Sequence, residues 1–238
     1  MLKKKILSPT LTQRNQLKEN SRNENREAFE FTNEWFLGNV YGRGLEVNIT
    51  DIWEKIFSQH TIKSILEIGS YEGQSTTFLC EHFAKMGGVD ITCIDTWGGS
   101  FEHASHNMRE VEQRFDKNIK IVTNYYSSVN VRKMKTDSVN ACAQLIVEGK
   151  RSHFDLIYID GSHKSCDVLS DALLTYPLAK DGALIIFDDY LWNYGFRKTG
   201  NVLDTPKIGV DAFVNTYADK VEIIHGLPSY QLYIKKLN

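Results

Sequence analysis

Residues 64–76 read SILEIGSYEGQST, and the fold of the chain follows from this stretch. Its first half belongs to an aliphatic run over 62–69, which is typical of a short buried strand. Gly69 and Gly73 then bracket a polar turn, after which residues 73–86 carry apolar side chains at helical spacing. A strand, a glycine turn and an amphipathic helix predict the first half of a βαβ unit.

The same alternation continues along the chain. Further strands are predicted at 89–95, 119–124, 154–160 and 182–189, and further helices at 106–118, 137–150, 165–179 and 207–219. Strands that alternate with helices imply right-handed crossovers and a largely parallel sheet.

The end of the chain departs from this rule. Two strand-like runs, 221–226 and 230–236, leave no room between them for a helix. A parallel crossover needs a dozen or more residues, so the last strand is predicted to be antiparallel. The predicted fold class is therefore α/β, with a Rossmann-like, mostly parallel seven-stranded sheet, helices on both faces and an antiparallel C-terminal strand.

The predicted domain organisation is simple. Residues 1–27 are polar and rich in Asn, which predicts a mobile N-terminal tail, and residues 28–238 form a single domain. Within it, residues 28–60 are predicted to be a helical cover over the mouth of the sheet. The segment NITDIWEKIF (48–57) supplies its helix, with Thr50 or Asp51 as the expected N-cap.

Composition excludes several classes of function. The chain has 238 residues and a net charge of -2, so it has no global attraction to nucleic acid or to an anionic membrane. No apolar run approaches the length of a membrane helix, and no secretory signal is recognised. Its four cysteines are scattered. We therefore expect a cytoplasmic protein with no nucleic-acid or membrane partner.

Acidic residues collect at the predicted strand ends. Strands one, two, four and five end with Glu67, Asp95, Asp160 and the pair Asp188–Asp189. Ligands of open α/β sheets bind beyond the carboxyl ends of the strands. Acids at four of five such ends therefore predict a functional site along this edge.

The sequence of the glycine turn limits which class of ligand the site can bind. It is not GxGxxG, because Ser75 stands where the third glycine would be, and no Gly-Lys-Ser/Thr follows it. Asp95 lies about 20 residues further on, where a carboxylate can accept both hydroxyls of a ribose. This combination predicts a nucleoside that carries a short polar chain.

Four segments, 67–76 (EIGSYEGQST), 94–97 (IDTW), 154–163 (FDLIYIDGSH) and 182–190 (GALIIFDDY), carry a resemblance to a known family. In this order and spacing they resemble the class I S-adenosylmethionine-dependent methyltransferases, and most of all the small O-methyltransferases that act on catechols and sugars. The resemblance covers roughly residues 60–236. It implies S-adenosylmethionine as cofactor, bound by Glu67, Gly69, Tyr71, Gly73, Ser75, Asp95 and Trp97.

The resemblance assigns a specific part to five of these residues. Gly69 lies under the methionine portion, while Glu67 and Ser75 fix its amino-acid end. Asp95 holds the ribose, and Trp97 flanks the adenine.

The resemblance also implies a metal site made of Asp160, Asp188 and Asp189. Oxygen ligands suit Mg²⁺, Mn²⁺ or Ca²⁺, and a divalent ion would turn carboxylate repulsion into coordination. In the alternative, Asp188 caps a helix or accepts backbone N–H groups and Asp189 is solvated.

The implied reaction is methyl transfer to a hydroxyl group of a small molecule. Asp160 would act through the metal, and His163 is the candidate general base, because imidazole titrates near neutrality. A purely structural imidazole is the alternative.

Other functions stay open at this point. They are a metal-independent small-molecule methyltransferase, a non-catalytic S-adenosylmethionine-binding module and, with a poorer match, an NAD(P)-dependent oxidoreductase. The loops 97–106 and 190–209 are long enough to be lids. His103 and His106 are taken as solvated loop residues. The sequence leaves the acceptor and the oligomeric state open, a homodimer included.

Overall fold

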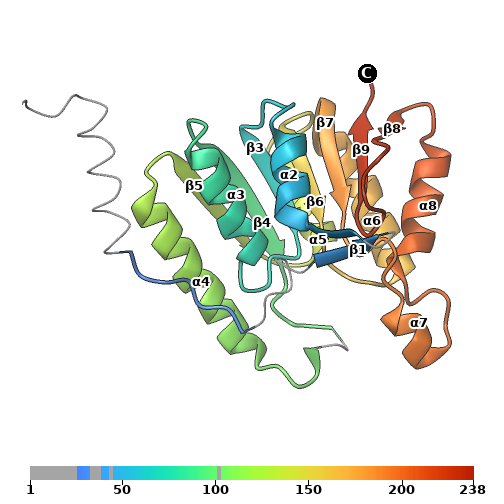
Figure 1. The fold of residues 1–238 in the computed structure, drawn as a ribbon, viewed down its shortest axis with the longest axis horizontal. Helices are drawn as coiled ribbons and strands as arrows, with labels where there is room; N and C mark the ends of the chain where they lie inside the picture. Colours follow the sequence, from blue (N-terminus) through green and yellow to red (C-terminus); the bar gives the residue numbers. More distant parts are fainter. Residues whose placement is uncertain (1–25, 33–38, 43–44, 101–102) are drawn as a thin grey trace, which may run out of the picture.

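The computed structural model describes residues 26–32, 39–42, 45–100 and 103–238. Its centre is a seven-stranded sheet in the order β5-β4-β3-β6-β7-β9-β8 (Figure 1). Neighbouring strands are parallel except for β9, which is antiparallel to both β7 and β8. The predicted fold class is thus confirmed. The strands are β3 (Ser64–Ile68), β4 (Val89–Asp95), β5 (Val129–Lys135), β6 (Phe154–Ile159), β7 (Ala179–Phe187), β8 (Val221–Ile223) and β9 (Leu232–Lys236).

Helices cover both faces of this sheet (Figure 1). One face packs against α2 (Ile49–Phe57), α3 (Gln74–Ala84) and α4 (Met108–Tyr125). The other packs against α5 (Ser138–Val147), α6 (Ser165–Thr175) and α8 (Pro206–Thr216). The central strands are mainly apolar because successive side chains enter opposite cores. Two short helices, η2 (Tyr176–Leu178) and α7 (Tyr194–Thr199), lie in connections.

The strand order reverses beside β3. The chain runs outward from β3 through β4 to β5, then returns to place β6 on the other side of β3. Such a switch opens a crevice beyond the carboxyl ends of the two central strands. Within the described part of the chain, no helix is long and apolar enough to cross a membrane.

The predicted third strand, residues 119–124, is wrong. These residues form the second half of α4, where Ile121 and Val122 continue the buried stripe begun by Val111 and Phe115. The strand is instead Val129–Lys135 at the edge of the sheet. Charged side chains protect edge strands from pairing with other chains, and they also hide the aliphatic signature of a strand.

The N-terminal cover is only partly helical. A hairpin of β1 (Asn39–Gly42) and β2 (Leu45–Asn48) precedes α2 and lies near the carboxyl ends of the central strands (Figure 1). The N-cap of α2 is Asn48, whose side chain accepts from Thr50 N, so neither Thr50 nor Asp51 is the cap. The predicted tail lies outside the described residues except for its last two, and Arg26 there pairs with Glu81.

Gly69 allows β3 and β6 to meet at the switch point. Its φ is +83°, and an added Cβ would lie 1.8 Å from the carbonyl oxygen of Asp160. We therefore expect Gly69→Ala to lower the free energy of unfolding by about 3 kcal/mol or more. The variant would have to displace the backbone of Asp160 and would also strain position 69, where φ is positive. Chemical denaturation measures this change.

Gly149→Ala is the matched control, since φ is +78° there and nothing lies within 4 Å of the added Cβ. This variant should cost only the left-handed strain, about 1 kcal/mol. Equal losses in the two variants would contradict the close approach.

Candidate active site

The turn after β3 is tied to the end of β4. The backbone N–H groups of Ser70 and Tyr71 donate to Asp95 Oδ2 at 3.0 and 2.9 Å, and Trp97 N donates to Oδ1 at 2.6 Å. A carboxylate has about four acceptor sites. Asp95 is therefore fixed in place by three donors while it retains capacity for a ligand hydroxyl.

Glu67 lies beneath this turn and is fully buried. Ser70 and Ser75 each donate a hydroxyl to it at 2.6 Å, and the Thr76 hydroxyl donates at 2.5 Å. Burial raises the pKa of Glu67, and the hydroxyl donors oppose that rise. Glu67 and Ser75, both predicted to contact cofactor, thus bond to each other and brace the turn. Their direct contact with cofactor stays a prediction.

Aromatic side chains flank the turn. The Tyr71 hydroxyl lies 2.8 Å from His106 Nδ1, and the Tyr71 ring stacks on His103 with ring centroids 5.1 Å apart. These two histidines therefore hold the loop against the turn. Trp97 is only 4% exposed, and its indole N–H donates to Tyr71 O at 2.9 Å. Its predicted contact with adenine remains untested.

The acids after β6 and β7 form one cluster. Burial, followed by the charges of Asp188 and Asp189, raises the pKa of Asp160 well above its usual range. Burial and the neighbouring Asp189 raise the pKa of Asp188 to about 6. The predicted meeting of the three carboxylates is thus present, and their charges destabilise one another.

Tyr158 stands between two of these acids. Its buried hydroxyl contacts Asp160 Oδ2 at 3.0 Å and also donates to Asp188 Oδ2. One hydroxyl carries one proton, so it cannot donate fully to both carboxylates at once. This arrangement suits a cluster that shares a proton or a cation.

His163 completes the cluster. Its Nε2 lies 2.9 Å from Asp189 Oδ2, and its ring centroid lies 4.3 Å from that of Trp192. Asp189 has φ +53°, a conformation that residues other than glycine rarely adopt. The Tyr230 hydroxyl donates to Asp189 Oδ1. Strained backbone held by several partners is common at functional sites.

Three side chains of the cluster have possible metal-ligand atoms that are close enough to share an ion. One ligand atom each from Asp160, His163 and Asp189 lies within 4.8 Å of the other two. Asp188, predicted as a ligand, is not in this group. Its oxygens accept from Tyr158, Gln231 and the Asp189 N–H instead.

A family model described as a methyltransferase domain matches residues 66–190, more than half of the chain. The chain belongs to the methyltransferase domain family. The match begins in β3 and ends just after the paired aspartates, so it includes both the glycine turn and the acid cluster. The resemblance to the methyltransferases is thus confirmed.

Comparison with solved structures gives the same fold. An O-methyltransferase from Bacillus cereus, in complex with SAH, matches with a TM-score of 0.53 and 17% identity, over 98% of this chain and 94% of that one. The O-methyltransferase TomG from Streptomyces achromogenes, in complex with SAM, matches with a TM-score of 0.56 and 14% identity, over 82% and 83%.

A curated sequence relative is the mimivirus protein "Uncharacterized protein R132" of Acanthamoeba polyphaga mimivirus. It is 26% identical over 156 residues, which cover 64% of this chain. The alignment spans 63% of the viral protein's length.

The sequence alone does not mark several residues of the site. Tyr158 stands inside a predicted buried strand, and Tyr230 and Gln231 lie at the end of the β8–β9 connection, about 40 residues after the aspartates they contact. Trp53 of α2 was also missed, although its indole donates to Gln231. No motif marks these residues, and the contacts of Tyr230 and Gln231 with the aspartates exist only because β9 pairs with β7.

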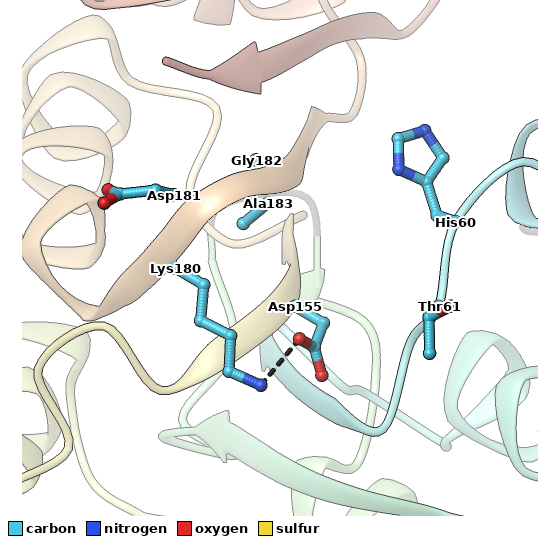
Figure 2. A pocket seen from close by; sticks show the side chains of 7 residues that line it. All are labelled: His60, Thr61, Asp155, Lys180, Asp181, Gly182 and Ala183. Carbon is cyan, nitrogen blue, oxygen red and sulfur yellow. Dashed lines mark hydrogen bonds and ion pairs between the residues drawn. The ribbon is translucent and has the colours of Figure 1, made fainter. Parts of the chain in front are cut away.

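A separate hollow lies at the amino-terminal ends of the central strands, opposite the acid cluster. It is lined by His60, Thr61, Asp155, Lys180, Asp181, Gly182 and Ala183, which precede β3 or lie near the starts of β6 and β7 (Figure 2). Asp155 pairs there with Lys180 at 2.6 Å and accepts from the backbone of Lys63 and Ser64. These contacts fasten strand starts together, so the hollow is distinct from the acid cluster.

Replacing one crowded acid should stabilise the metal-free protein. The pKa values of Asp160 and Asp188 lie above those of the unfolded chain. The folded state therefore binds extra protons between about pH 4 and the folded pKa values, and stability falls as pH rises through that window. We expect Asp160→Asn, measured in EDTA, to raise Tm by roughly 3 °C at about pH 8 and to lose this advantage near pH 4.

Asp181→Asn is the control, because Asp181 lies at the far end of β7 with its side chain 60% exposed. Its Tm should follow that of the wild type. A lower Tm for Asp160→Asn at both pH values would contradict the repulsion.

Proposed function

We propose that this methyltransferase domain transfers the methyl group of S-adenosylmethionine to a hydroxyl of a small molecule, assisted by a divalent cation. The observation that carries the proposal is the position of the glycine turn directly against the acid cluster. Gly69 directly follows β3 and Asp160 directly follows β6, and the backbones of these two residues approach closely at the switch point. A cofactor on the turn and an acceptor at the acids would therefore be neighbours.

The residues of the turn suit the proposed cofactor. Asp95 is held facing the turn by three backbone donors, as a ribose-binding carboxylate must be. Gly69 and Gly73 have positive φ and carry no side chain, so the backbone of the turn can approach a ligand closely. When bound, S-adenosylmethionine supplies the activated methyl group.

The acid cluster suits a hard divalent cation. Partly buried carboxylates with raised pKa values are stabilised when a cation neutralises their repulsion. Asp160 and Asp189 would hold the ion through oxygen atoms, which favours Mg²⁺ or Mn²⁺ over zinc. The ion would bind neighbouring acceptor oxygens and lower the pKa of the reacting hydroxyl.

His163 is proposed as the general base. Its Nε2 is 2.9 Å from Asp189 Oδ2, so the proton of the neutral ring belongs on Nε2. In that tautomer, Nδ1 carries the lone pair that can take the acceptor's proton. Asp189 orients the imidazole and stabilises the imidazolium that forms. Contact with Trp192 restricts the ring further.

The metal-independent and non-catalytic alternatives remain outcomes of the tests. Cytoplasmic location, a homodimer and the absence of nucleic-acid partners also stay predictions.

Cofactor binding is tested by calorimetry with S-adenosylhomocysteine and, separately, with NAD. We expect binding of the first but not the second at millimolar concentration. Asp95→Asn should weaken S-adenosylhomocysteine by about tenfold, because one charge-assisted hydrogen bond to the ribose is lost.

Asp90→Asn, on the same strand β4 but with an exposed side chain, is the matched control and should bind like the wild type. Failure of the wild type to bind S-adenosylhomocysteine would overturn the proposed activity.

The role of His163 is tested with radiolabelled S-adenosylmethionine and a panel of catechol and sugar acceptors. His163→Ala should lower turnover by about 100-fold or more while the Kd for S-adenosylhomocysteine stays within about twofold. Unchanged turnover in the variant would reject His163 as the base.

A further inference from the structure

We infer that Glu72 and Asn118 are positioning residues that clamp an N-terminal strap, residues 26–32, onto the glycine turn, so that docking of the strap and binding of S-adenosylmethionine stabilise each other. This inference rests on the proposed function, because it takes the turn as the cofactor site. It goes beyond that function, since Glu72, Asn118 and the strap all lie outside the predicted set of site residues.

The strap lies along α4 and reaches the glycine turn (Figure 1). It forms neither helix nor strand, and its residues are half-buried or exposed. Ion pairs hold its outer part: Arg26 pairs with Glu81 of α3, and Lys117 of α4 pairs with Glu30 at 2.9 Å. Ion pairs that water reaches contribute little to stability, so the strap depends on the buried side chains that it contacts.

Asn118 is the first of these buried side chains. It is fully buried on α4, one helical turn after Arg114 and on the same helix face. Its Oδ1 accepts from Glu30 N at 2.8 Å, and its Nδ2 donates to Glu30 O and to Glu72 O, both at 2.9 Å. One side-chain amide therefore binds the backbone of the strap and the backbone of the turn together.

Glu72 is the second buried side chain. It is 2% exposed and lies inside the glycine turn, next to Tyr71, whose N–H donates to Asp95. The Glu72 carboxylate accepts from the Thr32 N–H at 2.7 Å, from the Thr32 hydroxyl at 2.8 Å and from Arg114 Nε at 2.5 Å. A buried carboxylate is costly unless it is paired and hydrogen-bonded. Departure of the strap would remove two of these three donors and thereby destabilise the turn.

The two sides of the turn are therefore linked. Its inner side holds Asp95, the carboxylate proposed to bind the ribose, and its outer side holds the strap. A cofactor that binds the ordered turn favours the docked strap. By linkage, the docked strap favours the cofactor by the same factor.

The coupling is tested by amide hydrogen exchange, resolved to single residues by NMR, with and without saturating S-adenosylhomocysteine. The N–H groups of Glu30 and Thr32 report directly on the clamp, because they donate to Asn118 and Glu72. We expect the ligand to slow their exchange by about tenfold or more. Unchanged exchange of both amides in a protein that binds the ligand would overturn the coupling.

The matched control amide is that of Asn140. It also donates to a carboxylate, that of Asp137 at 2.9 Å, but at the N-terminus of α5 on the other face of the sheet. Its exchange rate should be the same with and without the ligand.

Variants of the strap test the reverse direction by calorimetry. Thr32→Pro removes both donors to Glu72 and should weaken S-adenosylhomocysteine by about tenfold, while Tm stays near that of the wild type because Thr32 is exposed and outside every helix and strand. Thr32→Ser keeps both donors and should bind like the wild type. Ala28→Pro, an exposed change of the same kind within the strap, should also leave the Kd unchanged. A wild-type Kd in Thr32→Pro would contradict the clamp.

Asn118→Ala tests the other half of the clamp and needs no cofactor. Alanine keeps the helix and removes the amide, so we expect exchange of the Glu30 N–H to become about tenfold faster or more. Wild-type exchange in this variant would show that Asn118 does not hold the strap. If the wild type binds no S-adenosylhomocysteine, the proposed activity and the coupling fail together, whereas binding with unchanged exchange of the strap amides rejects the coupling alone.

Discussion

The close backbone approach of Gly69 to Asp160 is the constraint on which the site depends. The Gly69 N–H donates to Ile94 O on one side, and the Asp160 N–H donates to Ile68 O on the other, both at 2.8 Å. These bonds carry the central strands past their carboxyl ends and into two turns that touch. Any side chain at position 69 would separate them. The chemistry proposed here needs the two turns in contact, because methyl donor and acceptor must meet within bonding range.

Beside this contact, the carboxylates that follow β6 and β7 repel one another and destabilise the fold. Asp160 and Asp188 are partly buried near a third carboxylate, and burial and mutual repulsion raise the pKa of both. Hydroxyl donors from Tyr158 and Tyr230 and the amide of Gln231 offset part of this cost. The clustered carboxylates destabilise the folded protein, whereas a bound cation would make their contribution to stability favourable. The strained backbone of Asp189 fits the same interpretation, since strain is retained where a site requires it.

The sequence predicted what depends on local pattern. The strands around 62–69 and 182–189 are mainly apolar, so the sequence predicts both the fold class and the acids at the strand ends. The edge strand Val129–Lys135 was missed because its three basic side chains make it resemble a solvated segment. Residues 119–124 look like a strand alone and are helical because their apolar side chains continue the stripe of α4. Gln231 could not be found at all, since its role exists only once β9 pairs with β7.

The most direct test is anomalous diffraction from crystals grown with Mn²⁺ and S-adenosylhomocysteine. The account predicts a manganese peak bonded to Asp160 and Asp189. It also predicts the ribose on Asp95 and the sulfur atom turned toward the metal. A peak on Asp188 alone, or a nucleoside bound away from the turn after β3, would contradict it.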